Sequence, residues 1–135
     1  MTIVVGYVPK PEGRAALRRA VEEARLRHAK LVVINSNRGG RELDDEDALR
    51  YERELEDIRD ELDSEGVEHE VRQLVRGLEP AEDLIAVAEE VSADFIVIGL
   101  RRRSPVGKLI LGSNSQHILL TADCPVLAVK ARRPE

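Results

Sequence analysis

Short apolar runs alternate along this chain with longer segments in which apolar residues recur every three or four positions. A continuous apolar run such as Phe95–Ile98 is typical of a β-strand that is covered on both faces. The spacing of Leu17, Ala20 and Ala24 is typical of the buried stripe of an amphipathic helix. The whole pattern predicts strands at residues 2–7, 31–35, 67–75, 94–98 and 125–130, and helices at residues 13–29, 48–65, 80–91 and 114–122.

The strand predicted at residues 67–75 differs from the others, because apolar and polar residues alternate in it. Such alternation indicates one partly exposed face, as at the edge of a sheet, so His69 is expected at the surface. Alternating strands and helices predict an α/β fold, in which a parallel sheet carries helices on both faces. No linker divides the chain, so we expect one domain over residues 1–135.

The composition fits a globular protein with one core, since 42% of the 135 residues are hydrophobic. There is no long uncharged apolar run, and Met1–Gly6 lacks the basic head of a signal peptide. We therefore expect a cytoplasmic protein that does not bind membranes. Cys124 is the only cysteine and cannot form an internal disulfide, and its place before Pro125 predicts a small buried apolar residue.

Charge is distributed unevenly along the sequence. Residues 41–70 hold fifteen acidic and four basic residues, which is typical of the solvated face of a helix. From Gly99 to the end there are seven basic and two acidic residues. The net charge is −5 and the aromatic residues number only three, so the chain lacks the stacking surface that single-stranded nucleic acid needs. We expect no nucleic-acid partner.

The basic residues gather in residues 99–115, which join a predicted buried strand to a predicted helix. Gly99 ends the strand, and Gly112 precedes the helix. A helix start presents unpaired backbone N–H groups and the positive end of a dipole, so it readily accepts a phosphate. Ser113 and Ser115 can donate hydroxyl hydrogen bonds there. Four cations of this segment can add charge-assisted contacts, namely Arg101, Arg102, Arg103 and Lys108.

This segment resembles the universal stress protein family. The family signature is a glycine, two residues, a second glycine, nine residues, and then glycine with serine or threonine; here Gly99, Gly112 and Ser113 match, while Arg102 replaces the second glycine. The resemblance extends over nearly the whole chain. Its other parts are the opening strand, the helix with Ala15–Leu17, the turn at residues 77–81 and the segment at residues 122–129.

The resemblance implies a Rossmann-like fold, with an open five-stranded parallel sheet of order 3-2-1-4-5. Ligands bind such a sheet where the strand order reverses, here between the first and fourth strands. In nucleotide-binding members the loop holds the triphosphate and ribose, and the end of the second strand lies by the adenine. Those members usually have a nucleoside-contacting aspartate where this chain has Val8. The implied ligand is ATP or AMP, with Mg²⁺ only beside bound nucleotide, and the implied site consists of Gly6, Tyr7, Val8, Ser36, Gly99, Arg101, Arg102, Gly112, Ser113, Asn114 and Ser115.

We therefore predict a nucleotide-binding stress-response protein that is not a dedicated enzyme. A P-loop, a G-x-G-x-x-G fingerprint and a G-x-S-x-G elbow are all missing from the sequence, so we expect at most slow ATP hydrolysis. An enzyme of nucleotide or adenylate transfer has no visible machinery either.

The alternative is a dimeric interaction module of the same fold that does not bind nucleotide. Arg102 would then plug the loop instead of binding phosphate. Under both hypotheses we expect a homodimer through the last strand, residues 125–130, because its apolar edge would otherwise leave unpaired N–H and C=O groups exposed.

Overall fold

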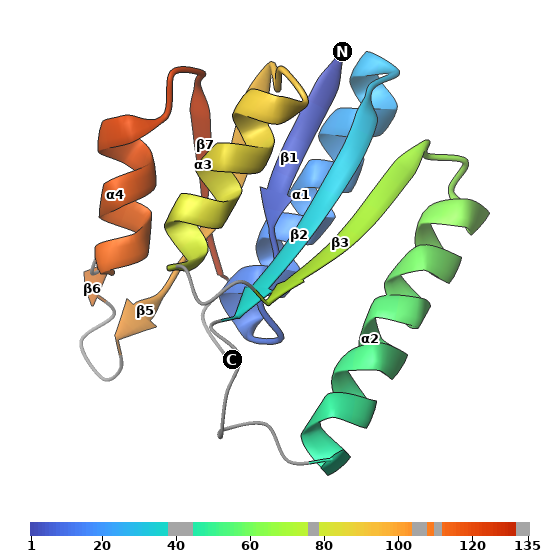
Figure 1. Ribbon diagram of the computed structural model, residues 1–135. Coiled ribbons are helices and arrows are strands. Elements are labelled where there is room, and N and C mark those ends of the chain that lie inside the picture. The colour runs from blue at the N-terminus through green and yellow to red at the C-terminus, as the bar shows by residue number, and fades with distance from the viewer. Residues whose placement is uncertain (38–44, 76–78, 104–107, 110–111, 132–135) are drawn as a thin grey trace.

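The computed structural model contains one five-stranded sheet in which all paired strands are parallel (Figure 1). It describes residues 1–37, 45–75, 79–103, 108–109 and 112–131. The strand order is β3-β2-β1-β4-β7, which is the order 3-2-1-4-5 once the main strands are numbered along the chain. The predicted fold class is thus confirmed. The strands are β1 (Thr2–Gly6), β2 (Lys30–Asn37), β3 (His69–Val75), β4 (Phe95–Leu100) and β7 (Val126–Lys130).

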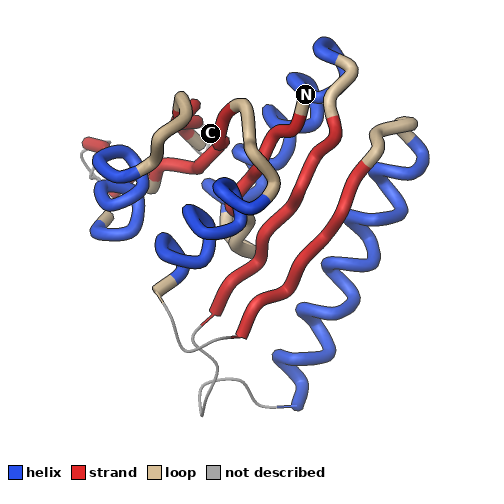
Figure 2. The backbone as a smooth tube through the Cα atoms, turned by 45° about the horizontal axis from the view of Figure 1, so that its top comes forward, coloured by secondary structure: helices blue, strands red, loops and turns tan. Residues whose placement is uncertain are grey.

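In the described part of the chain, four helices cover the two faces of this sheet (Figures 1 and 2). One apolar cluster joins the sheet to α1 and α2, through residues such as Ala20 and Leu55, and a second joins it to α3 and α4, through Leu84 and Ile118. Burial of these two clusters is the main force that holds the helices to the sheet. The helices are α1 (Pro11–Arg27), α2 (Asp45–Ser64), α3 (Pro80–Glu90) and α4 (Ser113–Thr121). Within the described residues, no helix is long and apolar enough to cross a membrane.

Two of the helices begin with proline. Pro11 and Pro80 occupy the first turns of α1 and α3, where the missing N–H is not needed and the fixed φ already suits the helix. For this reason α1 starts at Pro11, two residues before the predicted Gly13. Its last residue is Arg27, and the C-cap is His28, which has a left-handed φ of 51° and donates its backbone N–H to carbonyl oxygens of the last turn.

A short antiparallel pair of strands lies between β4 and α4, where the sequence predicts a loop. It pairs β5 (Arg102–Arg103) with β6 (Lys108–Leu109). Two-residue strands are too short to produce a periodic pattern, so the sequence gives no sign of them. The predicted roles of the side chains of Arg102, Arg103 and Lys108 lie outside what the structure describes.

Two residues are exposed to a different extent than the sequence predicts. His69 was expected at the surface, but its side chain is only 14% exposed. The reason is that β3 begins at His69, which pairs with Leu31 and so faces the side that α2 covers, and its Nδ1 lies 2.8 Å from the Val67 carbonyl oxygen. Cys124 was expected to be buried and is half-buried; that partial burial raises the pKa of its thiol.

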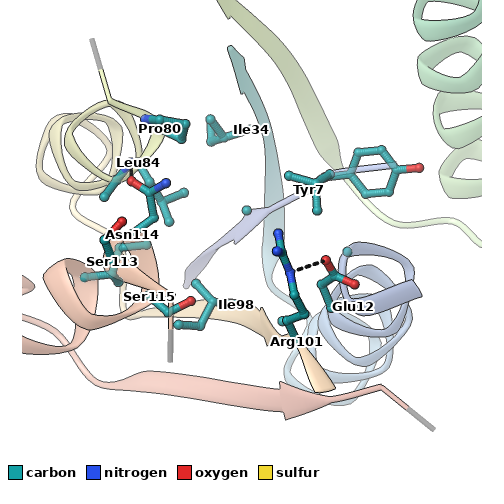
Figure 3. Close-up of a pocket in the computed structure, with 17 residues that line it drawn as sticks. Tyr7, Glu12, Ile34, Pro80, Leu84, Ile98, Arg101, Ser113, Asn114 and Ser115 are labelled. Atoms are coloured by element: carbon teal, nitrogen blue, oxygen red, sulfur yellow. Dashed lines mark hydrogen bonds and ion pairs between the residues drawn. The ribbon is translucent and has the colours of Figure 1, made fainter. Parts of the chain in front are cut away.

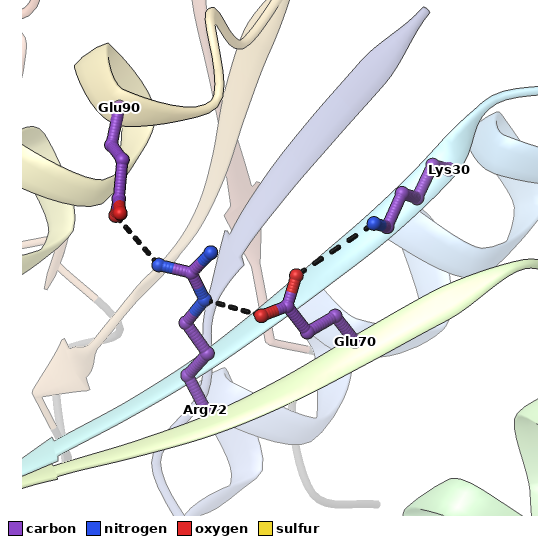
Figure 4. Close-up of polar contacts among 4 residues, drawn as sticks. All are labelled: Lys30, Glu70, Arg72 and Glu90. Carbon is purple, nitrogen blue, oxygen red and sulfur yellow. Dashed lines mark hydrogen bonds and ion pairs between the residues drawn. The ribbon is translucent and has the colours of Figure 1, made fainter.

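On the other face, an ionic network links the edge strand β3 to β2 and α3 (Figure 4). The Arg72 guanidinium donates to Glu70 and to Glu90, each at 2.7 Å, and Lys30 lies 3.7 Å from the second Glu70 oxygen. The hydrogen bond from Arg72 lowers the pKa of Glu70. The network places charge along this edge, a feature that discourages pairing with another sheet.

The first turn of α1 packs directly against the ends of β1 and β4. A Cβ added to Gly13 would overlap the carbonyl oxygen of Val8, and one added to Gly99 would overlap the carbonyl oxygen of Glu12. Both obstacles are backbone atoms, which cannot swing aside as a side chain can. The fold therefore requires glycine at both positions.

We predict that Gly13→Ala and Gly99→Ala each lower the free energy of unfolding by about 2 kcal/mol or more, because overpacked backbone must shift. Gly112→Ala is the matched control, since a Cβ there meets no atom within 4 Å, and it should change stability by less than about 1 kcal/mol. Urea unfolding measures all three. Wild-type stability in Gly13→Ala or Gly99→Ala would contradict the close packing.

Candidate functional site

A cavity of about 430 Å³ opens at the carboxyl ends of β1 and β4, where the strand order reverses (Figure 3). This is the position at which open α/β sheets bind ligands. The first turns of α1, α3 and α4 all contribute to its wall. The described residues that line it are Gly6, Tyr7, Val8, Glu12, Gly13, Ile34, Pro80, Ala81, Leu84, Ile98, Gly99, Arg101, Gly112, Ser113, Asn114, Ser115 and Ile118.

The start of α4 forms the polar part of this wall. Its N-cap is Gly112, which has no side chain to cap the first N–H groups, and its first turn contains no acidic residue. A side chain at position 112 would meet open space, so the helix start is accessible. Ser113 and Ser115 lie on this first turn and both line the cavity (Figure 3). The arrangement offers backbone and hydroxyl donors together with the positive end of the helix dipole.

Asn114 joins the start of α4 to the start of α3. Its Oδ1 accepts a hydrogen bond from the backbone N–H of Ala81 at 3.3 Å. That N–H belongs to the first turn of α3 and has no partner within its own helix. The two helix starts are therefore held beside one another at the cavity.

Apolar side chains make up much of the remaining wall. Ile34 comes from β2, Leu84 from α3 and Ile98 from β4, and all three are at most 4% exposed. With Pro80 and Ile118 they give the cavity a rigid apolar surface of the kind that holds a flat ring. Sequence reasoning missed these residues as site components, because an apolar residue at a strand end has the same pattern as one in the core.

Glu12 and Arg101 form a charged pair at the cavity wall, on the first turn of α1 and just after β4. Arg101 Nε lies 3.7 Å from Glu12 Oε1 (Figure 3). The Glu12 side chain is only 14% exposed, whereas that of Arg101 is 66% exposed. Arg101 was predicted as a site residue, but Glu12 was missed. The only sequence feature that could have indicated Glu12 is that it is an acidic residue early in the helix that follows the first strand.

Tyr7 lines the cavity, but its ring points away from the cavity toward α2 (Figure 3). The ring is 3% exposed and belongs to the apolar cluster of α1 and α2, and its hydroxyl donates a hydrogen bond to Glu54. Arg14 lies 3.4 Å from the same carboxylate. Burial raises the pKa of the Tyr7 hydroxyl well above its ordinary value, and the hydrogen bond to Glu54 adds to this effect. The side chain of Tyr7 thus serves packing, and its backbone faces the cavity.

The structure brings most of the predicted site residues together. Ser36 lies in β2 and Arg102 in β5, but neither is among the described lining residues, and their side chains lie outside what the structure describes. Gly99 lines the cavity, and its missing side chain makes room for the backbone of α1. In the described ranges, no three His, Cys, Asp or Glu side chains gather as a metal site.

Comparisons with known proteins agree on one family. The sequence model of the universal stress protein family matches residues 1–130. A universal stress protein of Mycolicibacterium smegmatis is 44% identical over 130 residues, which cover 95% of this chain and 96% of that protein. The structure of a universal stress protein from Archaeoglobus fulgidus has a TM-score of 0.81 at 43% identity, covering 96% of this chain and 98% of the other. A structure from the same organism in complex with dAMP has a TM-score of 0.76 at 37% identity, with the same coverage.

The buried Tyr7 hydroxyl gives a prediction about alkaline pH. A tyrosine in the unfolded chain loses its proton near pH 10, whereas folded Tyr7 keeps it. Below that pH the contribution of Tyr7 to stability is complete; above it, the free energy of unfolding should fall as pH rises.

Tyr7→Phe should remove this part of the alkaline decline and cost about 1 kcal/mol at neutral pH, through the lost hydrogen bond. Urea unfolding of both proteins between neutral pH and pH values above about 10 measures the effect. Identical pH profiles for wild type and Tyr7→Phe would contradict it.

Proposed function

Because this chain belongs to the universal stress protein family, we propose that it is an adenine-nucleotide-binding protein and not a dedicated enzyme. The nucleoside occupies the cavity between β1 and β4, and its phosphate lies against the start of α4. ATP and AMP are both ligands of this kind, and Mg²⁺ accompanies only the bound nucleotide. Residues 1–135 act as a single domain.

The observation that carries this proposal is the uncapped start of α4, which opens onto a cavity with apolar walls. A phosphate needs donors and positive potential, and the first turn of α4 supplies both. A base needs a flat apolar surface, which Ile34, Leu84 and Ile98 supply. The relative that was crystallised with dAMP, 37% identical and matched over 96% of this chain, supports the same ligand class.

The lining residues also support a binding role without efficient chemistry. The cavity wall has serine hydroxyls, but the described lining residues include no histidine or cysteine that could serve as base or nucleophile. Glu12, the one carboxylate among these lining residues, lies on a different helix from the serines and across the cavity from them (Figure 3). Hydrolysis of bound ATP is therefore slow at most.

A second candidate function, an interaction module that works as a dimer, is favoured by the edge strand β7. In the described part of the chain β7 pairs only with β4, so its other edge has no strand beside it. Val126, Leu127, Ala128 and Val129 are all half-buried along this strand. A twofold axis perpendicular to β7 would pair this edge with that of a second copy and satisfy its open N–H and C=O groups.

We predict that Ser113→Glu weakens AMP binding by about tenfold or more, roughly 1.4 kcal/mol, because its carboxylate repels a phosphate at the start of α4. An acid at a helix start is otherwise favourable, so the melting temperature should not fall. Isothermal titration with AMP and ATP measures the affinities.

Thr121→Glu, which adds the same charge at the far end of α4, is the matched control and should bind like wild type. Equal AMP affinity in Ser113→Glu and wild type would place the phosphate elsewhere; a wild type that binds neither nucleotide would refute the function.

For the edge strand, we predict a dimer in sedimentation equilibrium at micromolar concentration. Val126→Lys, which adds a charge next to the open edge, should shift the protein toward monomer. Because Val126 packs against the apolar cluster of α3 and α4, circular dichroism and thermal unfolding must verify that this variant is folded. Leu49→Lys is the control, because Leu49 is 54% exposed on α2, which packs at the opposite edge of the sheet. A purely monomeric wild type would exclude pairing through β7.

A further inference from the structure

Glu12 is the only carboxylate among the described residues that line the cavity. It stands on the first turn of α1, a few residues after the end of β1, and its side chain is 14% exposed. A site that holds only an anion gains nothing from a carboxylate, since like charges repel at short range. Its presence points to a ligand group that donates hydrogen bonds.

The described polar contact of this carboxylate is loose. Arg101 Nε lies 3.7 Å from Glu12 Oε1, beyond the usual range of a hydrogen bond, and the arginine side chain is 66% exposed. Ion pairs of an exposed arginine contribute little, because water and salt screen them. A hydrogen-bond donor of a ligand that enters the cavity can therefore donate to Glu12 without breaking a strong contact.

The cavity is also asymmetric. Ser113, Asn114 and Ser115 lie on one side of it, on α4, while Glu12 and Arg101 lie across from them beside β1 (Figure 3). One side thus offers donors for an anion, and the opposite side offers an acceptor. Val8, two residues after the end of β1, is 39% exposed and lines the wall, but its side chain can accept no hydrogen bond.

We propose that Glu12 is a specificity-determining residue, which accepts a hydrogen bond from a hydroxyl or amino group of the nucleoside and so orients the nucleotide with its phosphate toward α4. The inference rests on the proposed function. It assigns Glu12 the acceptor role that Val8 cannot fill. Arg101 turns from Glu12 toward solvent or phosphate when the nucleoside is bound.

The test compares adenosine, AMP and inorganic phosphate on wild type, Glu12→Ala and Glu12→Gln. Loss of one hydrogen bond to a charged group should weaken adenosine binding to Glu12→Ala by about tenfold or more, with Glu12→Gln in between. Phosphate alone should bind Glu12→Ala as tightly as wild type, or more tightly, because a negative charge has been removed from the cavity. Glu22→Ala, which removes an exposed acid farther along α1, is the matched control and should change neither affinity. Thermal unfolding verifies that each variant is folded.

Two analogues identify the donor group. If Glu12 accepts from the ribose hydroxyls, 2′,3′-dideoxyadenosine should bind wild type and Glu12→Ala equally; if it accepts from the amino group, purine riboside should do so. An undiminished effect of Glu12→Ala on both analogues would overturn the assignment. Equal adenosine affinity in wild type and Glu12→Ala overturns this inference alone, whereas a wild type that binds neither adenosine nor AMP overturns the proposed function and the inference with it.

Discussion

The fold and the cavity both depend on the backbone contact between the first turn of α1 and the ends of β1 and β4. Gly13 and Gly99 permit this contact because any side chain would overlap a carbonyl oxygen of the opposing segment. The contact holds Val8 and Glu12 at the carboxyl edge of the sheet and fixes the direction in which the chain leaves β4. The position of the cavity wall therefore follows from the packing of two glycines.

The opposite wall of the cavity depends on open space and not on close packing. Gly112 has open space around it, and the first turn of α4 has neither a capping side chain nor an acidic residue. The N–H donors that a capping side chain satisfies at many helix starts have no such cap here. Together the two walls combine a closely packed side that has an acceptor with an accessible side that has donors, and apolar side chains lie between them. The proposed nucleotide binding rests on this polarity.

Periodicity was sufficient to predict the fold, and topology with charge was sufficient to predict where the cavity lies. Runs such as Phe95–Ile98 specify buried parallel strands, and Gly112 and the serines of the first turn of α4 line the cavity as expected. The features that could not be predicted from the sequence depend on contacts between segments that are distant along the chain. Three features depend on such tertiary contacts: α2 covers His69, Gly99 packs against α1, and Glu12 lies in the cavity wall.

Chemical-shift mapping of the backbone amides during an AMP titration tests the central claim most directly, because it locates the ligand without changing any residue. The account predicts that the largest shifts fall on two groups of amides, residues 112–115 at the start of α4 and residues 6–8 and 99–101 at the ends of β1 and β4. Saturating shifts confined to other regions, such as β7 or the amino ends of the strands, would contradict it.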